Sequence, residues 1–457
     1  MRTERDSLGA VQVPATVLWG FQTQRSLDHF HISTEKMPAE FLEALAYVKQ
    51  ACIEVNAKNG RLSPLKADVL LAAVDEVLAG KLSHAFPLSV WQTGSATHTN
   101  MNMNEVLANR AIELLGGLLG VDHQIHPNDD VNMGQSSNDV IPTAMNVAAV
   151  CQLNGHLMPA LIQLIAALKR KSVDFSDIIK VGRTHLQDAV PLTLGQEFSG
   201  YVKQLETAMQ GIDLAIPRLY ELAIGGTAVG TGINAPDEFG VEVSRELEGL
   251  IGFPFRSIPN KFAALAGHEA IVLAHGAAKT LAVALTKIST DIRWMASGPR
   301  SGLGEITVPA NEPGSSIMPG KVNPTQCEAM AMICYQVMGN DSVIAMGAAA
   351  GNFELNAFKP LILHNFLQSI RLLSDGMRMF ARYCVEGIEP NIDKINELMN
   401  SSLMLATALT PHIGYDHSAS IANVAYRKNI SLRQAAIEST YVSAEEFDAW
   451  VRPEKMI

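Results

Sequence analysis

The sequence has 457 residues, of which 47% are hydrophobic, 18% charged and 6% aromatic. A chain of this length exceeds the size at which one core usually keeps growing, so two or three structural regions are expected, and the low aromatic content favours close-packed helices over sheets. The formal net charge of -11 disfavours nucleic acid as the main partner, because binding phosphates needs a basic face that the sequence does not show.

Five cysteines are spread along the chain without any CxxC pair. Their odd number and wide spacing disfavour a disulfide framework, a zinc site and a CxxC redox centre, and they fit a reducing compartment. The first residues, MRTERDSLGAVQVP, are too charged for the apolar segment of a signal peptide. We therefore expect a mostly α-helical protein of the cytoplasm.

Three regions are expected along the chain: a mixed N-terminal region (residues 1–134), a region of long helices (135–390) and a small C-terminal helical region (391–457). Helical apolar spacing predicts five long helices in the middle region, at about residues 138–172, 193–223, 263–297, 326–348 and 357–385. At ~1.5 Å per residue, the third of these would extend roughly 50 Å. Exposed apolar length of that kind favours a symmetric assembly.

The first polar cluster, at residues 93–105, has the sequence TGSATHTNMNMNE. It places hydroxyl and amide side chains, among them Ser95, Thr97 and Asn100, ahead of a helix that we expect to begin at Glu105. Backbone N–H groups at a helix N-terminus together with such side chains can hold carboxylate oxygens. The alternative is an ordinary helix cap, which needs only one such residue.

The second polar cluster, QSSND at residues 135–139, places Ser136, Ser137 and Asn138 at the start of the next helix. Taken alone it is a candidate capping box. The helix that follows has no formally charged side chain between residues 140 and 168, which resembles a membrane span in length. Polar and breaking residues such as Asn146, Gly155 and Pro159 interrupt this segment, so we expect a helix buried among other helices.

The third cluster, GRTHLQD at residues 182–188, contains the titratable side chain of His185 beside Thr184. A histidine can act as a general acid or base near neutral pH, although a lone histidine is more often structural.

The fourth cluster, GSSIMPGKVNPTQCE at residues 314–328, combines glycines and prolines that prevent regular structure with a serine pair, Lys321 and Asn323. Glu328 follows on the next predicted helix. A mobile loop of this kind can close over a ligand and exclude water, and its cation and amide can stabilise negative charge that develops on a carboxylate.

Two other motifs carry weaker alternatives. The segments GGTAVGTG (225–232) and SGLGE (301–305) are rich in glycine but lack the Lys-Ser/Thr ending of a P-loop and do not follow a strand, which disfavours nucleotide binding. A metal cluster is conceivable around residues 123–130, from His123, His126, Asp129 and Asp130, but no second His/Cys cluster supports it.

In combination these motifs resemble the fumarase/aspartase superfamily, and most closely its cofactor-free class II fumarases. The resemblance spans essentially the whole chain and rests on blocks in the expected order: GSATHTNMNMNEV, HPNDDVN, QSSNDV, GRTHLQDAVPLTLGQE, GGTAVGTGIN, GSSIMPGKVNP and GNFELN. It implies a homotetramer in which the long helices of four subunits form a twenty-helix core. It also implies that each active site takes polar regions from three subunits, needs no cofactor and no metal, and binds a small dicarboxylate.

The same resemblance implies reversible hydration of fumarate to malate. Ser315 corresponds to the proposed base of the family, and His185 together with Glu328 to the group that protonates the departing hydroxyl. Lys321 and Asn323 would stabilise the charge of an aci-carboxylate. The remaining substrate-binding residues implied are Ser95, Thr97, Ser136, Ser137, Asn138 and Thr184. A water activated by His185 remains the alternative base.

A second dicarboxylate site is implied by His126, Asn128 and Asp129, but His123 stands where relatives with such a site have arginine. Ala96 stands where glycine is usual, which can require a backbone φ that alanine tolerates poorly.

Two further functions remain open from the sequence. Aspartate ammonia-lyases of the same superfamily typically have glutamine in place of His185, and a different ending where this chain has TQCE, so both features favour hydration. The other alternative is a helical scaffold without activity, because a fold alone does not certify catalysis.

Overall fold

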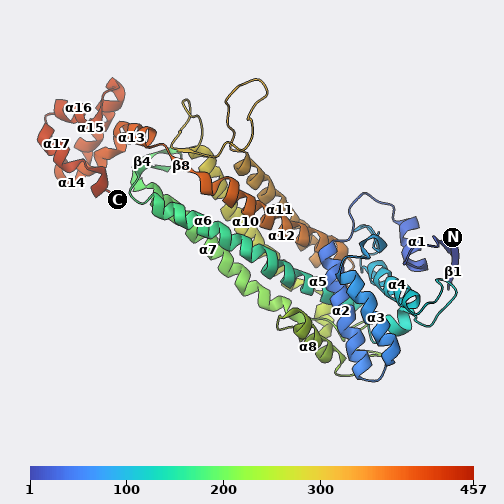
Figure 1. The fold of residues 1–457 in the computed structure, drawn as a ribbon. Coiled ribbons are helices and arrows are strands. Elements are labelled where there is room, and N and C mark those ends of the chain that lie inside the picture. The colour runs from blue at the N-terminus through green and yellow to red at the C-terminus, as the bar shows by residue number, and fades with distance from the viewer. The chain divides into compact units, whose positions relative to one another are not determined.

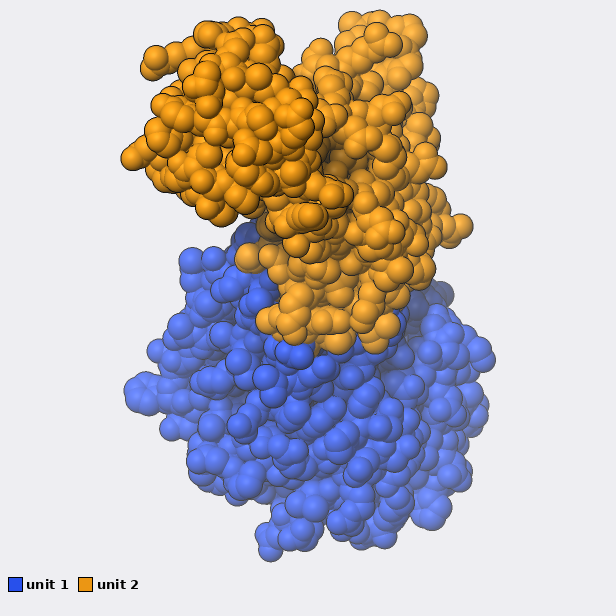
Figure 2. All heavy atoms as spheres, turned by 90° about the vertical axis from the view of Figure 1, so that its left-hand side faces the viewer, with its two compact units in different colours: residues 1–159, 210–280, 335–373 blue, residues 160–209, 281–334, 374–457 orange.

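The computed structural model describes all residues from 1 to 457, and the fold is mostly helical, as predicted. The chain divides into two compact units, coloured separately in Figure 2. Unit 1 comprises residues 1–159, 210–280 and 335–373, and unit 2 comprises residues 160–209, 281–334 and 374–457. The three-region division at residues 134 and 390 stays a prediction.

The five long helical segments predicted from apolar spacing are present (Figure 1). They are α5 (Ser137–Gln152) continued through a π-helical turn (Leu153–Leu157) into α6 (Met158–Asp174), α7 (Leu194–Leu219), α10 (Glu269–Met295), α11 (Thr325–Ala349) and α12 (Lys359–Tyr383).

Two ends of these helices differ from the prediction. Helix α7 ends at Leu219, because the chain then forms the short strand β5 (Glu221–Leu222), which pairs in parallel with β6 (Arg256–Ser257). The helix predicted from residue 263 is interrupted: α9 (Lys261–Ala266) ends where Gly267 takes an extended conformation, and α10 begins two residues later.

Unit 1 contains the N-terminal hairpin and a set of shorter helices packed on one another. They are β1 (Arg2–Asp6), β2 (Gly9–Val13), α1 (Phe21–His29), α2 (Ala39–Lys58), α3 (Pro64–Leu78), α4 (Thr97–Leu114) and α8 (Phe239–Ile251), with short 3-10 and π turns at Ser83–Ala85 and Pro127–Val131. Helix α2 packs against α3, α5 and α8, and its fully buried side chains Phe41, Leu45 and Ile53 form part of the core. This packing positions the N-termini of α4 and α5, where two of the predicted polar clusters lie.

Helix α4 begins at Thr97 and not at Glu105, so the prediction of its start was wrong by two turns. The polar residues of the first cluster are therefore the first turns of the helix itself. Glu105 lies further along the helix, almost fully buried, and its carboxylate accepts hydrogen bonds from the backbone N–H groups of Gly20, Gln22 and Thr23 at 2.9, 2.8 and 3.2 Å. Glu105 thus caps the N-terminus of α1, whose own N-cap residue has no capping side chain.

Unit 2 contains an antiparallel hairpin and the C-terminal helices. Its elements besides the long helices are β3 (Ile179–Thr184), β4 (Gln187–Thr193), β7 (Ile306–Thr307), β8 (Glu389–Pro390), α13 (Ile392–Ser401), α14 (Thr410–Ile413), α15 (Tyr415–Lys428), α16 (Leu432–Glu438) and α17 (Ala444–Trp450), with 3-10 turns at Val385–Gly387, Leu403–Leu409 and Pro453–Lys455. Buried apolar side chains of the C-terminal helices, among them Leu409, Ile421 and Ala436, form a core of their own that also includes Val181 of β3. The β3–β4 hairpin was not predicted as strands.

Two helices are long and apolar enough to cross a membrane by length and composition alone, Ser137–Asp174 and Glu269–Met295. Half of the most apolar window of the first is buried within the single chain, and 44% of that of the second. This burial is the pattern expected for helices packed among other helices.

Candidate active site

Three hydroxyl groups meet where α4 and α5 begin in unit 1. The Ser95 and Thr97 hydroxyls are hydrogen-bonded at 2.7 Å, and the Thr97 and Ser137 hydroxyls at 2.9 Å. Thr97 and Ser137 are the first residues of their helices, so the cluster lies at two positive helix ends. Donors of this kind can hold the oxygens of a carboxylate. The structure thus brings together three of the residues predicted to bind substrate.

The loop that leads into α4 is held against the segment before α12. The Gly94 carbonyl accepts a hydrogen bond from the Lys359 N–H at 2.9 Å, and a Cβ on Gly94 would lie 1.5 Å from the carbonyl oxygen of Ala357. Ala96 then adopts a left-handed conformation with φ of 57° and ψ of 25°. The departure from glycine noted in the sequence therefore falls at a position that requires positive φ, which strains an alanine.

Ser136 and Asp139 form the predicted capping box at the start of α5. The Ser136 hydroxyl accepts from the Asn138 N–H at 3.2 Å, and the Asp139 carboxylate accepts from the Ser136 N–H at 2.9 Å. The second oxygen of Asp139 accepts from the backbone N–H groups of Gly225 and Thr227. Burial raises the pKa of Asp139 to about 6, and these three donors oppose the rise. Asn138 adds a bond to the Ala228 carbonyl at 2.7 Å, so the glycine-rich segment serves to fix the start of α5.

Some of these residues line a cavity of about 530 Å³ in unit 1, although Ser95 and Asn138 are not among them. Thr97, Ser136 and Ser137 line it, and so do Asn128 and Asp129 of the predicted second site. Its other lining residues are Arg61, Asn100, Met101, Asn132, Met133, Gly134, Gln135, Thr227, Ala228, Ile233 and Asn234.

His126, the third residue of the predicted second site, lines a different cavity of about 550 Å³ together with His123. Its ring Nδ1 accepts a hydrogen bond from the Asp129 N–H at 3.2 Å. Asp130, a member of the conceivable metal cluster, is instead ion-paired with Lys66 at 2.8 Å, and no group of three or more His, Cys, Asp or Glu side chains is placed to hold a metal ion.

His185 lies at the tip of the β3–β4 hairpin in unit 2. His185 and Leu186 both have positive φ, 55° and 60°, which is the geometry of a two-residue hairpin turn and is strained for side chains other than glycine. The imidazole is exposed, as is the neighbouring Thr184.

A buried ion-pair network fixes the strands below this turn. The Arg183 guanidinium donates two hydrogen bonds to the fully buried carboxylate of Glu305, at 2.9 and 3.0 Å. Lys180, also buried, pairs with Glu305 at 3.3 Å and with Glu197 at 2.9 Å. Glu305 was missed in the sequence, where it appeared only as the end of a glycine-rich segment.

The predicted mobile loop has no regular structure between β7 and α11, as expected. It closes on itself through hydrogen bonds from the Gly314 N–H to the Lys321 carbonyl at 2.9 Å and from the Asn323 side chain to the Gly314 carbonyl at 2.6 Å. The Ser315 hydroxyl oxygen accepts hydrogen bonds from the N–H groups of Ile317 and Met318 at 3.2 and 3.0 Å. Two donors aimed at one oxygen stabilise its deprotonated form.

Lys321 is exposed and makes no ion pair, so its charge is available to a ligand. Glu328 lies in the first turn of α11 and makes only a long ion pair with Arg293, at 3.8 Å. Within the single chain no hydrogen bond or ion pair joins Glu328 to His185.

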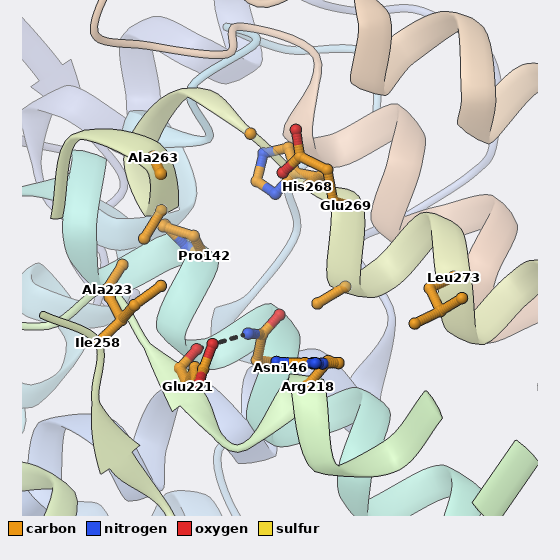
Figure 3. A pocket seen from close by; sticks show the side chains of 13 residues that line it. Pro142, Asn146, Arg218, Glu221, Ala223, Ile258, Ala263, His268, Glu269 and Leu273 are labelled. Atoms are coloured by element: carbon orange, nitrogen blue, oxygen red, sulfur yellow. Dashed lines mark hydrogen bonds between the residues drawn. The ribbon is translucent and has the colours of Figure 1, made fainter. Parts of the chain in front are cut away.

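A further cavity of about 420 Å³ in unit 1 contains none of the predicted site residues (Figure 3). It is lined largely by apolar side chains such as Ile258, Ala263 and Leu273, with Asn146 bonded to the Glu221 carbonyl at 3.0 Å. His268 also lines it, almost fully buried, with a ring Nε2 that has no hydrogen-bond partner, and burial lowers the pKa of His268 to about 3.

Comparison with known proteins places the chain in a family. Residues 9–339 match the family described as Lyase, and residues 405–457 match the family described as Fumarase C C-terminus. The class II fumarate hydratase of Chromobacterium violaceum is 62% identical over 100% of this chain and 99% of its own length, and that of Ralstonia nicotianae is 61% identical over 100% and 99%.

The fold agrees with these relatives. The crystal structure of class II fumarase from Schistosoma mansoni superposes with a TM-score of 0.97 at 46% identity, covering 100% of this chain and 98% of that one. The alternatives left open by the sequence, an aspartate ammonia-lyase and an inactive scaffold, are therefore set aside. The chain belongs to the fumarase/aspartase family of lyases, among the class II fumarate hydratases.

Proposed function

We propose that the chain catalyses the reversible anti addition of water to fumarate, giving (S)-malate through a dianionic aci-carboxylate. The observation that carries this mechanism is the Ser315 hydroxyl oxygen, which accepts two backbone hydrogen bonds in a loop that also holds Lys321 and Asn323. Removing the C3 proton of malate needs a base beside groups that stabilise the new negative charge.

In this mechanism Ser315, as alkoxide, takes the proton from C3 and the electron pair passes into the adjacent carboxylate. Lys321 and Asn323 stabilise the resulting charge. His185, oriented by Glu328, then donates a proton to the departing hydroxyl, which leaves as water. The hydroxyls of Ser95, Thr97 and Ser137, with Ser136, Asn138 and Thr184, orient the substrate carboxylates.

The site would be complete only in a homotetramer. The three hydroxyls of Ser95, Thr97 and Ser137, which we call the cradle, lie in unit 1, whereas His185 and Ser315 lie in unit 2. Glu328 makes no bond to His185 within one chain. We therefore assign the three polar regions of each site to three subunits, with the long helices of four subunits forming a twenty-helix core in the cytoplasm.

Two variants test the assigned roles. Ser315→Ala and His185→Asn should each lower kcat by ~10² to 10⁴, the usual effect of removing a positioned base or acid. The measurement is the absorbance of the conjugated product with malate as substrate, and with aspartate as the comparison. Ser316→Ala is the control, because this neighbouring serine is exposed and makes no hydrogen bond, and it should keep most of the wild-type turnover.

Exchange of the C3 proton of malate with deuterated solvent separates the two steps. Ser315→Ala should lose this exchange, since no carbanion forms, whereas His185→Asn should retain it, since only the departure of the hydroxyl is blocked. Exchange lost in His185→Asn and kept in Ser315→Ala would instead identify the base as a water activated by His185.

A further inference from the structure

Lys49 is a lysine buried completely inside unit 1, on helix α2. Its ammonium donates hydrogen bonds to two amide side chains, to Asn132 Oδ1 at 3.0 Å and to Gln135 Oε1 at 2.8 Å, and it makes no ion pair. A buried charge is costly unless it is paired, so a lysine held only by neutral amides needs an explanation.

The amides that hold Lys49 form one connected cluster. Asn132 Oδ1 accepts from Lys49 and also from the side chains of Asn100 and Asn104, both at 3.1 Å. The Asn132 amide nitrogen in turn donates to the Gln135 carbonyl at 3.1 Å. Three donors on one oxygen fix the position of Asn132, and removing the lysine would remove the only charged one of them.

This amide cluster forms part of the wall of the 530 Å³ cavity. Asn100, Asn132 and Gln135 line the cavity that Thr97 and Ser137 also line. The ammonium of Lys49 therefore lies one side chain behind the surface that the proposed cradle presents to a carboxylate. Because water screens a buried charge less than a surface charge, the ammonium acts more strongly on a ligand in the cavity than an exposed lysine at the same distance would.

No charged or titratable group around Lys49 forms an ion pair with its ammonium, whose hydrogen-bond partners are the two amides. The carboxylate of Asp139 on α5 makes no ion pair with Lys49 and accepts from three backbone N–H groups, but its negative charge raises the pKa of Lys49 and so opposes the effect of burial. Burial raises the pKa of the Cys52 thiol, on α2 itself, so this thiol stays uncharged.

Most charged groups on the other neighbouring elements are paired or add positive charge. The exceptions are Asp129, which lines the cavity and lies 3.2 Å from His126 Nδ1, and Glu242 on α8, which accepts from the Asn59 side chain. Lys66 on α3 is paired with Asp130, and Glu246 on α8 with Lys58. Arg61, which lines the cavity, donates only to the Asn56 side chain and the Asn234 carbonyl and makes no ion pair. Burial lowers the pKa of Lys49 to about 7, so a bound dianion would favour its charged form near neutral pH.

We propose that Lys49 is a positioning residue for dicarboxylate binding: it holds the Asn132 and Gln135 amides in place and supplies, from behind them, the positive charge that the dianionic substrate neutralises. The inference rests on the proposed function, because it assumes that the cradle of Thr97 and Ser137 binds the substrate.

Lys49→Met tests it, because methionine retains most of the side-chain volume and removes the charge. KM for malate and the inhibition constant for the unreactive dicarboxylate succinate should both rise about 10- to 100-fold, while kcat changes much less, as expected for the loss of one nearby charge. In the wild type, KM should rise as pH increases through the pKa of Lys49, since the ammonium is lost. In Lys49→Met this rise should be absent.

Cys52→Ala is the matched control, since it removes another fully buried side chain one turn away on α2 without touching the amides. It should leave KM and its pH dependence as in the wild type. An unchanged KM in Lys49→Met, or a KM that still rises with pH as in the wild type, overturns the proposal. Ser137→Ala distinguishes a failure of the proposed function from a failure of the role of Lys49. If Ser137→Ala does not raise KM, the assignment of the cradle is wrong. If Ser137→Ala raises KM and Lys49→Met does not, only the role of Lys49 is wrong.

If Lys49→Met fails to fold, the proposal can be tested instead by the binding of succinate to the His185→Asn protein, which retains Lys49. At a pH about one unit above neutral, calorimetry in two buffers of different ionisation enthalpy should show proton uptake on binding. Binding without proton uptake overturns the proposal.

Discussion

Three of the nine non-glycine residues with positive φ lie at or beside residues to which we assign a function. Ala96 precedes Thr97 with a left-handed backbone, and His185 and Leu186 form the strained tip of their hairpin. A residue other than glycine in this region costs about 1–2 kcal/mol. The surrounding structure therefore over-determines these positions, at Ala96 through the clamp on Gly94 and at His185 through the network of Glu305.

Glycine substitution measures how much of this strain is stored. Thr440 is an exposed residue with φ of 62° and no side-chain hydrogen bond, so Thr440→Gly should raise the free energy of unfolding by about 1 kcal/mol. Ala96 has the same backbone but a buried methyl group, whose loss costs about 0.8 kcal/mol. Ala96→Gly should therefore change stability less than Thr440→Gly. Thermal unfolding of both variants checks this, and an equal gain would show that the methyl group contributes nothing.

Helix α1 depends on a capping group that lies far away in the sequence. Glu105 of α4 accepts three backbone N–H groups at the start of α1 and the Thr23 hydroxyl at 2.6 Å. Burial raises the pKa of Glu105 to about 7, while these four donors oppose the rise. The carboxylate is the only side-chain partner of these amides, so the two helices are coupled by it.

Removing this cap should release α1. Glu105→Ala leaves buried donors without partners, which costs about 1–3 kcal/mol for each unsatisfied group, so a loss of several kcal/mol in unfolding free energy is expected. Hydrogen exchange at the amides of Gly20, Gln22 and Thr23 should accelerate more than exchange at Phe21, whose N–H donates to Glu4. Glu113→Ala is the control on the same helix: Glu113 is partly exposed and pairs with Arg110, and its loss should cost at most about 1 kcal/mol. Equal losses in both variants would contradict the capping role.

The elements show what a sequence can and cannot predict here. The five long helices follow from apolar spacing, and the capping box of Ser136 and Asp139 from a local four-residue pattern. The start of α4 was placed too late, because its first two turns consist of Thr, His, Asn and Met residues, and the polar ones among them are typical of loops. Asn100, Asn102 and Asn104 are buried in the interior of unit 1 by packing against other elements, which local sequence preferences do not reveal.

The site shows the same division. Thr97, Ser137, His185 and Ser315 were identified from residue type and motif order, because hydroxyls, an imidazole and a loop lysine stand out in an apolar helical chain. Glu305 and Lys49 were not, because each acts through partners distant in sequence: Glu305 through Arg183, and Lys49 through Asn132. For Lys49, the only signal in the sequence was a lysine within an apolar stretch of α2.

At the scale of the whole molecule, the long helices expose apolar side chains that a single chain does not cover. Leu214 of α7 is 79% exposed, Met346 of α11 is 71% exposed, and Leu273 of α10 and Met332 of α11 are also more than half exposed. Soluble proteins seldom leave such side chains uncovered along several helices. In a soluble enzyme of this family the two membrane-length helices are core helices, and these faces are where we place the contacts between subunits.

If each active site takes regions from different subunits, two variants that each impair a different region of the site should restore activity to each other. In a mixed tetramer of Ser137→Ala and Ser315→Ala chains, some sites receive the intact cradle from one chain and the intact loop from the other. Random assortment into closed tetramers restores about a quarter of the sites. Mixing after reversible dissociation, or co-expression, followed by the malate assay should therefore recover up to that share of wild-type activity.

A mixture of Thr97→Ala and Ser137→Ala chains is the control. These two hydroxyls are bonded to each other within one chain, so every chain in this mixture lacks one of them and no combination of subunits contains an intact pair. No recovery in the first mixture would mean that each site belongs to a single chain or that the roles are wrongly assigned. Recovery in the control would mean that Thr97 and Ser137 of one chain do not serve the same site.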